Sequence, residues 1–273
     1  MEQSVGPLTR LPLGGRARRF ARMLGAGRGR RLVRMLAAGW DRAPRGLRPL
    51  PGPYFLPSGY RSRERPAYDY EHRDDGIVYQ PNVYADAARI AERLGSPRII
   101  DVGCGNGEKL VALYPRFEIV GIDHGENLLR CRERFPFGTW LEHDLDSAKP
   151  LPLSDDVAGS VLICADVIEH LRYPERLLRN LRVALGRAHA TLISTPERDL
   201  TWGTGHMGPP PNPAHVREWA LNEFAALLAA HSFEQGFIGL TRSSNTRTLQ
   251  NTILAVVFPD TRRLAAARDS LVG

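Results

Sequence analysis

The chain has 273 residues, of which 42% are hydrophobic and 25% are charged, as is typical of a globular protein. No run of 18 uninterrupted apolar residues occurs, so the sequence predicts no membrane span. The formal net charge of +7 is unevenly distributed, because residues 1–50 contain twelve arginines and only two acids. The three cysteines, Cys104, Cys131 and Cys164, are widely spaced, which predicts buried thiols in a reducing compartment rather than a disulfide framework or a zinc site.

Residues 1–50 form a basic, arginine-rich extension. The stretch between Arg18 and Trp40 has the composition of an interrupted amphipathic helix, which would bind a membrane surface or an anionic partner. The same composition is also that of a transit peptide. Three glycines at alternate positions, 25, 27 and 29, weaken such a helix by about 1 kcal/mol each, which favours a poorly ordered extension instead.

The next 30 residues, 51–80, are rich in proline and tyrosine and read as a linker and lid. From residue 81 onward, helical and strand patterns alternate. Helices are expected at 81–94, 107–113, 125–133, 174–185 and 222–230, and strands at 98–102, 117–122, 138–142, 159–164, 190–194, 233–240 and 251–258. This alternation predicts an α/β, Rossmann-like, doubly wound sheet over residues 81–260. Residues 261–273 are expected to be a C-terminal tail.

The stretch Ile99–Gly107 is the most informative part of the chain. An apolar run ends on Asp101 and is followed by Gly103, Gly105 and Gly107. Glycines at these positions let the backbone turn sharply and approach a ligand closely. The dinucleotide-binding fingerprint would place glycine at position 108, where this chain has a glutamate. A nucleotide-like cofactor at the carboxyl end of a strand is therefore expected, with the spacing Asp-x-Gly-x-Gly-x-Gly.

Later strands also end on acids. Asp123 lies sixteen residues past the last of the three glycines, a distance that one helix can fill. A carboxylate at this place can accept hydrogen bonds from both hydroxyls of a ribose. Asp144 follows the next strand, and the apolar run Val161–Cys164 leads into Asp166-Val167-Ile168-Glu169-His170.

With these motifs in this order, residues 80–258 resemble the class I S-adenosylmethionine-dependent methyltransferases, of the bacterial small-molecule and glycan-associated type and similar to the ubiquinone-pathway O-methyltransferases. The resemblance implies a seven-stranded sheet whose last strand runs antiparallel, S-adenosyl-L-methionine as cofactor, and a segment before the first strand that covers the cofactor. The implied cofactor contacts are Asp101, Gly103, Cys104, Gly105, Gly107, Asp123, His124, Asp144 and Leu145. A Rossmann-like domain for another nucleotide is the alternative.

Among these contacts, the resemblance assigns Asp101 and the glycine loop to the methionine end of the cofactor. It assigns Asp123 to the ribose, and Asp144 with Leu145 to the adenine.

Three histidines are candidate general bases: His170, His206 and His215. The spacing of Asp166, Glu169 and His170 predicts that they share a face of one helical turn, where they could bind a divalent metal ion as the equivalent residues of the ubiquinone-pathway enzymes do. We expect no metal and keep this as the alternative. The other two histidines lie in a long Pro-rich loop after the fifth strand, a length typical of functional loops. That loop resembles one found in glycan-associated bacterial methyltransferases.

The sequence therefore predicts a cytoplasmic enzyme that methylates a small molecule, on an oxygen of a sugar, a lipid-linked glycan or a secondary metabolite. The basic extension would add a membrane-peripheral or anionic contact. RNA or protein methylation is one alternative, although Cys164–Val167 stands where amino-directed nucleic-acid methyltransferases carry a Pro-Pro-aromatic signature. A non-catalytic, cofactor-binding partner subunit is the other.

Overall fold

The computed structural model describes residues 53–67, 77–233 and 236–272. The predictions made for residues 1–50 lie outside this part of the chain. Within it, no helix combines the length and the apolar character needed to cross a lipid bilayer.

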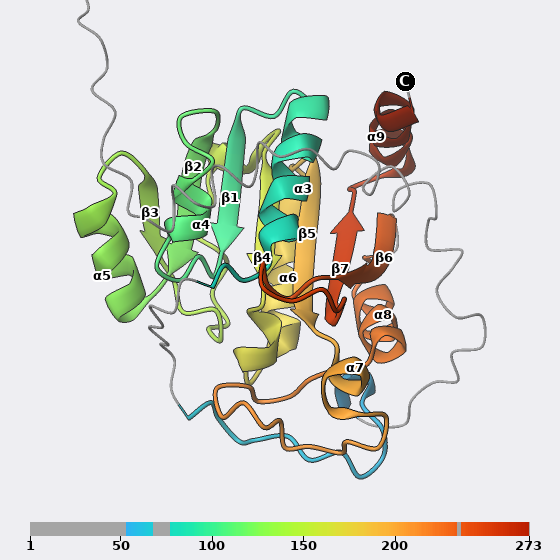
Figure 1. The fold of residues 1–273 in the computed structure, drawn as a ribbon. Helices are drawn as coiled ribbons and strands as arrows, with labels where there is room; N and C mark the ends of the chain where they lie inside the picture. The colour runs from blue at the N-terminus through green and yellow to red at the C-terminus, as the bar shows by residue number, and fades with distance from the viewer. Residues whose placement is uncertain (1–52, 68–76, 234–235, 273) are drawn as a thin grey trace, which may run out of the picture.

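A mixed sheet of seven strands forms the centre of the molecule (Figure 1). Its strands are β1 (Arg98–Val102), β2 (Glu118–Asp123), β3 (Thr139–Glu142), β4 (Val161–Ala165), β5 (Ala190–Pro196), β6 (Gly236–Thr241) and β7 (Thr252–Val257). The order across the sheet is β3-β2-β1-β4-β5-β7-β6. Strands β1 to β5 are parallel, whereas β7 runs antiparallel to both β5 and β6. The predicted fold class, including the antiparallel last strand, is confirmed.

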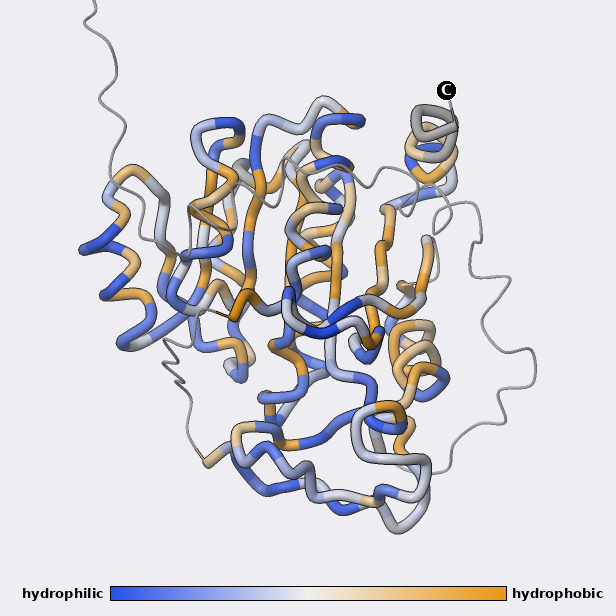
Figure 2. Tube along the Cα trace, in the orientation of Figure 1, coloured by the Kyte–Doolittle hydropathy of each residue, from blue (hydrophilic) through white to orange (hydrophobic). Residues whose placement is uncertain are grey.

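Helices cover both faces of this sheet, as expected for parallel strands joined by crossovers. They are α3 (Pro81–Arg93), α4 (Glu108–Val111), α5 (Gly125–Arg134), α6 (Pro174–Leu185), α7 (Arg198–Trp202), α8 (Leu221–Ala230) and α9 (Thr261–Val272). Apolar residues of α3, α4, α5 and α9 pack into one core layer, and those of α6 and α8 pack into the other. Hydrophobic residues accordingly concentrate on the strands and on the helix faces turned toward them (Figure 2).

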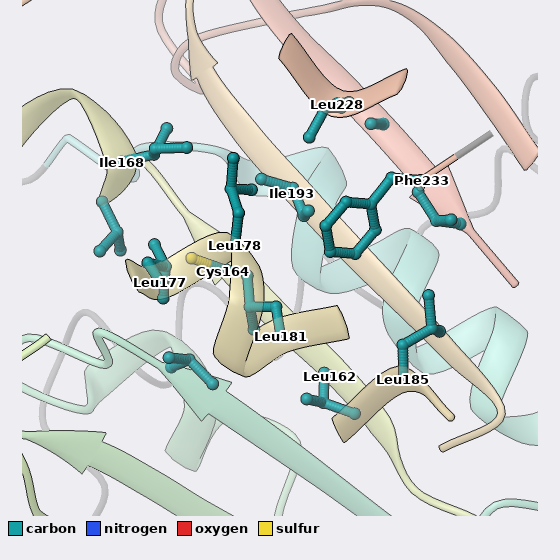
Figure 3. Packing of buried hydrophobic residues seen from close by; sticks show 14 of the residues in the cluster. Leu162, Cys164, Ile168, Leu177, Leu178, Leu181, Leu185, Ile193, Leu228 and Phe233 are labelled. Atoms are coloured by element: carbon teal, nitrogen blue, oxygen red, sulfur yellow. The ribbon is translucent and has the colours of Figure 1, made fainter. Parts of the chain in front are cut away.

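The second layer shows why the central strands carry continuous apolar runs. Every residue of β4 and of β7 is buried, because helices or loops cover both faces of the strands. In Figure 3, the leucines of α6 lie against residues of β4 and β5 and against the phenylalanine that precedes β6; the labelled residues include Leu162, Cys164, Leu177, Leu178, Leu181, Leu185, Ile193 and Phe233.

Two elements differ from the sequence-based expectation. Residues 261–273 were expected to be a tail, but 261–272 form α9, which packs against α3 through Leu264 and the buried Ala267. The long segment after β5 was expected to be a loop, but its first residues form the short helix α7. In both segments the helical pattern of apolar residues extends over only one or two turns. A helix this short is not stable by itself, so tertiary packing determines whether it forms.

Two segments far apart in the sequence run side by side below the carboxyl ends of the strands (Figure 1, blue and orange). We call residues 53–67 the strap and residues 203–217 the loop. Their backbones are joined by hydrogen bonds from Arg61 N to Met207 O, Arg63 N to Val216 O and Ala67 N to Pro213 O. The strap and the loop together form a cover over this end of the sheet.

Side chains attach this cover to the domain. The guanidinium of Arg217 donates hydrogen bonds to the carbonyl oxygens of Leu171 and Arg172 and lies 4.3 Å from the centre of the Tyr54 ring. The indole of Trp219, which is fully buried, donates to the Tyr54 carbonyl oxygen. The cover is therefore built into the core.

A buried ion pair joins α7 to α8 behind the loop. Two nitrogens of Arg198 lie 2.6 Å and 2.8 Å from the carboxylate oxygens of Glu223, and the two side chains are only 3% and 5% exposed. The same guanidinium also bonds Asp199 and lies over the Tyr60 ring of the strap. Because the pair is buried and bidentate, removal of one partner leaves an uncompensated charge.

We therefore expect Arg198→Ala to lower the free energy of unfolding by about 3–5 kcal/mol, because Glu223 is left buried without its counter-ion. Urea unfolding followed by circular dichroism measures this loss. The matched control is Arg187→Ala, which breaks the exposed pair with Asp155 and should cost about 1 kcal/mol or less. Equal losses in the two variants would contradict the role given to the buried pair.

Candidate functional site

A cavity of about 1380 Å³ opens at the carboxyl ends of the parallel strands. It lies where β1 pairs with both β2 and β4, so the chain order reverses there, and ligands of open α/β sheets bind at such a point. Residues after β1, β2, β3 and β4 line one side, and residues of the strap, the loop and the β6–β7 connection line the other. The volume exceeds the roughly 300–1,000 Å³ of a typical single-ligand pocket, so two small molecules fit.

Gly103 and Gly105 of the glycine loop line this cavity, whereas the predicted cofactor contact Gly107 is not among the lining residues. Gly103, Gly105 and Gly107 all have positive φ values, of 83°, 55° and 73°. A Cβ atom on Gly103 would lie 2.4 Å from Val167, and one on Gly107 would lie 2.9 Å from Cys131, whereas a Cβ on Gly105 would meet nothing within 4 Å. The first and third glycines are thus required by packing within the protein, and the second leaves backbone open to a ligand.

Asp123 lies at the end of β2, beside this loop. One carboxylate oxygen accepts a hydrogen bond from Gly105 N and the other from His124 N, both at 2.8 Å. Burial raises the pKa of Asp123, although these hydrogen bonds oppose the shift. Asp123 and the His124 side chain both line the cavity, as do the predicted cofactor contacts Cys104, Asp144 and Leu145.

Asp101 lies behind the glycine loop, outside the residues that line the cavity. It is fully buried, and its Oδ2 accepts a hydrogen bond of 2.7 Å from the Tyr84 hydroxyl. Its Oδ1 has no hydrogen-bond partner among the described residues. Burial raises the pKa of Asp101 to about 6, against the Tyr84 hydrogen bond and the nearby Lys109 ammonium, which lower it. An unpartnered buried acceptor at this place fits a cationic group of a cofactor.

Among the cavity residues that the sequence analysis missed are Gln80 and Lys109. The Lys109 ammonium donates a hydrogen bond of 3.1 Å to Gln80 Oε1, and the Gln80 amide nitrogen donates to Asp166 Oδ2. Burial lowers the pKa of Lys109. This chain of contacts connects the glycine loop with the end of β4. The sequence contains one indication that Lys109 is special, because it is one of only two lysines in a chain that has 35 arginines.

Beyond the glycine loop, three side chains form what we call the acceptor wall: Glu169, His170 and His215. Glu169 is fully buried; its Oε2 accepts a hydrogen bond from Thr195, and its Oε1 has no partner among the described residues. Burial raises the pKa of Glu169, with the carboxylate of Asp166 as a second cause. The free Oε1 lies 4.0 Å from Nε2 of His170.

The two histidines of the wall are held by different partners. Nδ1 of His170 lies 3.0 Å from Ala214 O, and because a carbonyl oxygen only accepts, Nδ1 carries the hydrogen and Nε2 keeps its lone pair. Partial burial, then the neighbouring His215, lowers the pKa of His170, so this ring is neutral at pH 7. Nδ1 of His215 donates to Glu218 at 2.5 Å, and its Nε2 lies 2.9 Å from the amide nitrogen of Asn212.

The third candidate base, His206, is not among the residues that line the cavity. Its ring lies beside that of Trp202, with the ring centres 6.4 Å apart. The structure therefore brings together two of the three predicted bases, in perpendicular rings whose centres are 4.8 Å apart, and leaves the third outside.

The predicted geometry of the alternative metal site is wrong. Asp166 has a φ of 53° and precedes the 3₁₀ helix η4 (Ile168–His170), so Asp166, Glu169 and His170 do not share one helical turn. Asp166 is instead bound to Gln80 and Ser194. Among the described residues, the group whose possible ligand atoms all lie within 4.8 Å of one another consists of Glu169, His170 and His215.

Comparisons with known proteins agree with this arrangement. A family model described as a methyltransferase domain matches residues 79–237. A probable S-adenosylmethionine-dependent methyltransferase of Mycobacterium tuberculosis is 30% identical over 168 residues, which cover 60% of this chain and 56% of that protein. The chain thus spans about half the length of these relatives. A trans-aconitate 2-methyltransferase of Rhodopseudomonas palustris is 32% identical over 85 residues, covering 30% of this chain and 33% of that protein.

Among solved structures, human N-acetylserotonin methyltransferase in complex with S-adenosylmethionine superposes with a TM-score of 0.43 and 20% identity, covering 64% of this chain and 53% of that one. The family model matches more than half of the chain, over the sheet and the cavity described above. The chain therefore belongs to the methyltransferase domain family, as a class I S-adenosylmethionine-dependent member.

Proposed function

We propose that this protein transfers a methyl group from S-adenosylmethionine to an oxygen of a small, polar acceptor such as a sugar, a glycan unit or a secondary metabolite. The observation that carries the proposal is the single cavity that joins the glycine loop and Asp123 to the acceptor wall. A cofactor on one side and an acceptor on the other would face each other across it.

The bound cofactor would supply an activated methyl group on a cationic sulfur. The protein's contribution is then mainly alignment, and such positioning can lower a barrier by about 7–11 kcal/mol. Asp123 would accept hydrogen bonds from the two ribose hydroxyls, and a ligand would approach the backbone at Gly105, where a Cβ atom would meet no other atom within 4 Å. Asp101 lies behind the residues that line the cavity, and its Oδ1, which has no partner among the described residues, would accept a hydrogen bond from the ammonium of the methionine end.

The acceptor wall supplies the groups that would hold a hydroxyl. Nε2 of His170 carries a lone pair, has no protein partner among the described residues, and belongs to a side chain that is 36% exposed, on the cavity. The acceptor hydroxyl would pass its proton to Nε2 of His170 as its oxygen takes up the methyl group that the cofactor would supply.

Two observations support a small acceptor over a macromolecule. The strap and the loop cover the carboxyl end of the sheet and are attached to the core, which narrows access to the wall. In addition, two of the relatives are trans-aconitate 2-methyltransferases, and trans-aconitate is a small molecule. RNA or protein methylation and the non-catalytic subunit remain as outcomes that the experiments below can reveal.

Asp123→Ala should weaken binding of S-adenosylhomocysteine at least about tenfold, because hydrogen bonds to a charged group contribute about 1.5–3 kcal/mol each. Isothermal titration calorimetry measures the affinity. Glu118→Ala is the matched control, because Glu118 lies at the exposed amino end of the same strand. Wild-type affinity in the Asp123 variant would contradict the ribose assignment.

Asp101→Asn should stabilise the cofactor-free protein at pH 8 and do so to a smaller extent at pH 5. The folded pKa of about 6 lies above the ordinary value of 3.8, so folding favours the protonated carboxyl; the associated stability is lost as the pH rises from 3.8 to about 6 and is fully absent above that range. Thermal unfolding at both pH values measures the effect, with Glu118→Gln as an exposed control. The same variant should bind S-adenosylhomocysteine more weakly. A destabilised variant at pH 8 would overturn this account of Asp101.

His170→Ala should lower kcat about 100-fold, the low end of what a positioned base contributes, and leave the affinity for S-adenosylhomocysteine unchanged. The assay follows a labelled methyl group with an acceptor found by screening sugars, glycosides and small organic acids. His231→Ala, at the end of α8 and away from the cavity, serves as control. Unchanged turnover in the His170 variant would remove this residue from the mechanism. Tight cofactor binding without transfer to any acceptor would favour the non-catalytic subunit.

A further inference from the structure

We propose that Trp202, the last residue of α7, is the platform on which a sugar ring of the acceptor lies, and that the substrate class of this site is therefore a carbohydrate. This assignment rests on the proposed function, because the sugar is the acceptor of that reaction. Binding of the sugar can be measured without turnover, however, so the two proposals can be tested apart.

The first observation is the exposure of the Trp202 side chain. It is 41% exposed and lines the cavity, whereas the other two tryptophans among the described residues, Trp140 and Trp219, are 7% and 0% exposed. The ring of His206 lies 6.4 Å from the indole, centre to centre, at an angle of 47°, so it does not stack on the indole. Aromatic side chains on the wall of a cavity are surfaces that a ligand can cover.

The second observation is that the indole is held in one position. Its nitrogen donates a hydrogen bond of 2.6 Å to Oε2 of Glu218, and the other oxygen of this carboxylate accepts one of 2.5 Å from Nδ1 of His215. One buried carboxylate thus fixes both the indole and a ring of the acceptor wall. Because the indole nitrogen is already bound, the apolar carbon atoms of the ring are left for a ligand, and a ring held in advance loses little entropy on binding.

The third observation is the polar surface beside the indole. Thr201 precedes the tryptophan, and its hydroxyl accepts a hydrogen bond of 3.1 Å from the amide nitrogen of Asn251 in the β6–β7 connection. Oδ1 of that amide is buried and has no partner among the described residues. Other hydroxyl and amide side chains also line the cavity, namely Asn212, Ser243, Ser244, Thr246 and Thr252.

A pyranose ring matches both kinds of surface. Its C–H groups form an apolar face, which packs on the face of an indole, and its rim carries hydroxyl groups that both donate and accept hydrogen bonds. A planar aromatic acceptor would also stack on the indole. It would, however, remove water from the neighbouring hydroxyl and amide groups without offering them new partners, which costs free energy. The combination of one aromatic face with several polar side chains therefore favours a sugar.

The position of the indole relates the sugar to the acceptor wall. Glu218 joins the indole to His215, whose ring is perpendicular to that of His170 with the ring centres 4.8 Å apart. All four side chains belong to residues that line the cavity. A sugar on the indole would extend a hydroxyl group toward Nε2 of His170. The platform would thus select the molecule, and the wall would take part in the transfer.

The test measures binding of methyl α-glucopyranoside, methyl α-mannopyranoside and methyl α-galactopyranoside to the full-length protein by saturation-transfer NMR. At least one glycoside should bind the wild type. Trp202→Ala should weaken that binding at least about fivefold, the low end of what stacking on one aromatic side chain contributes for nucleobases. Trp202→Phe should weaken it less, because a phenyl ring keeps an apolar face. The matched control is Leu200→Ala, since Leu200 lies on the same helix, is 47% exposed and is not among the lining residues.

Two further readouts distinguish a platform from a structural role. Trp202→Ala should keep the circular dichroism spectrum of the wild type and its affinity for S-adenosylhomocysteine. In the wild type, selective irradiation of aromatic protons should transfer magnetisation to the ring C–H protons of the bound glycoside, a result that does not depend on the folding of any variant. Failure of all three glycosides to bind, absence of this transfer, or full glycoside binding by Trp202→Ala would each overturn the assignment.

These outcomes are separate from those that test the proposed function. If no glycoside binds but the protein methylates a phenol or an organic acid, the sugar platform is wrong and the methyltransferase proposal stands. If the protein does not bind S-adenosylhomocysteine, the proposed function fails whatever the glycoside measurements show.

Discussion

The arrangement of the site depends on one constraint, the reversal of strand order at β1. Because β2 and β4 flank β1, the segments that leave these strands diverge to opposite faces of the sheet and do not cover its edge. Polar side chains at the strand ends are therefore left beside a cavity instead of being packed into the core. Asp123 reaches this cavity from β2, and Glu169 and His170 follow β4. Sheet topology thus places the polar side chains that follow β2 and β4 at one edge of the sheet.

A second feature, the cover formed by the strap and the loop, is attached to that edge by many hydrogen bonds. The strap and the loop are about 140 residues apart in the sequence, yet they are joined by backbone hydrogen bonds and held by Arg217 and Trp219. The loop also carries Ala214, whose carbonyl oxygen fixes the ring of His170, and His215 itself. The cover thus does more than exclude solvent, because it orients two of the three side chains of the acceptor wall. Preorganised groups of this kind lose little entropy when a ligand binds.

The two sides of the cavity differ in how many of their polar groups have hydrogen-bond partners within the protein. On the cofactor side, hydrogen bonds from backbone nitrogens hold Asp123 in place before any ligand binds, although Oδ1 of the more deeply buried Asp101 has no partner in the described part of the chain. On the acceptor side, an oxygen of Glu169 and a ring nitrogen of His170 have no protein partner in the described part of the chain. The unsatisfied groups lie where methyl transfer would need a ligand to be recognised, which is consistent with a pocket shaped for a polar acceptor.

The sequence by itself determined the fold class and the position of each strand to within a few residues, and it predicted the edge of the sheet at which the cavity lies. It could do so because a strand that ends in an acid, followed by glycines with positive φ, is a local pattern in which each residue type is set by its own backbone. The acceptor wall was decided only by the tertiary structure. His215 reaches Glu169 because the strap holds the loop against the sheet, and Asp166 leaves the group because the chain turns at a positive φ instead of continuing as a helix. Residue spacing carries no information on such contacts, since they depend on where distant segments pack.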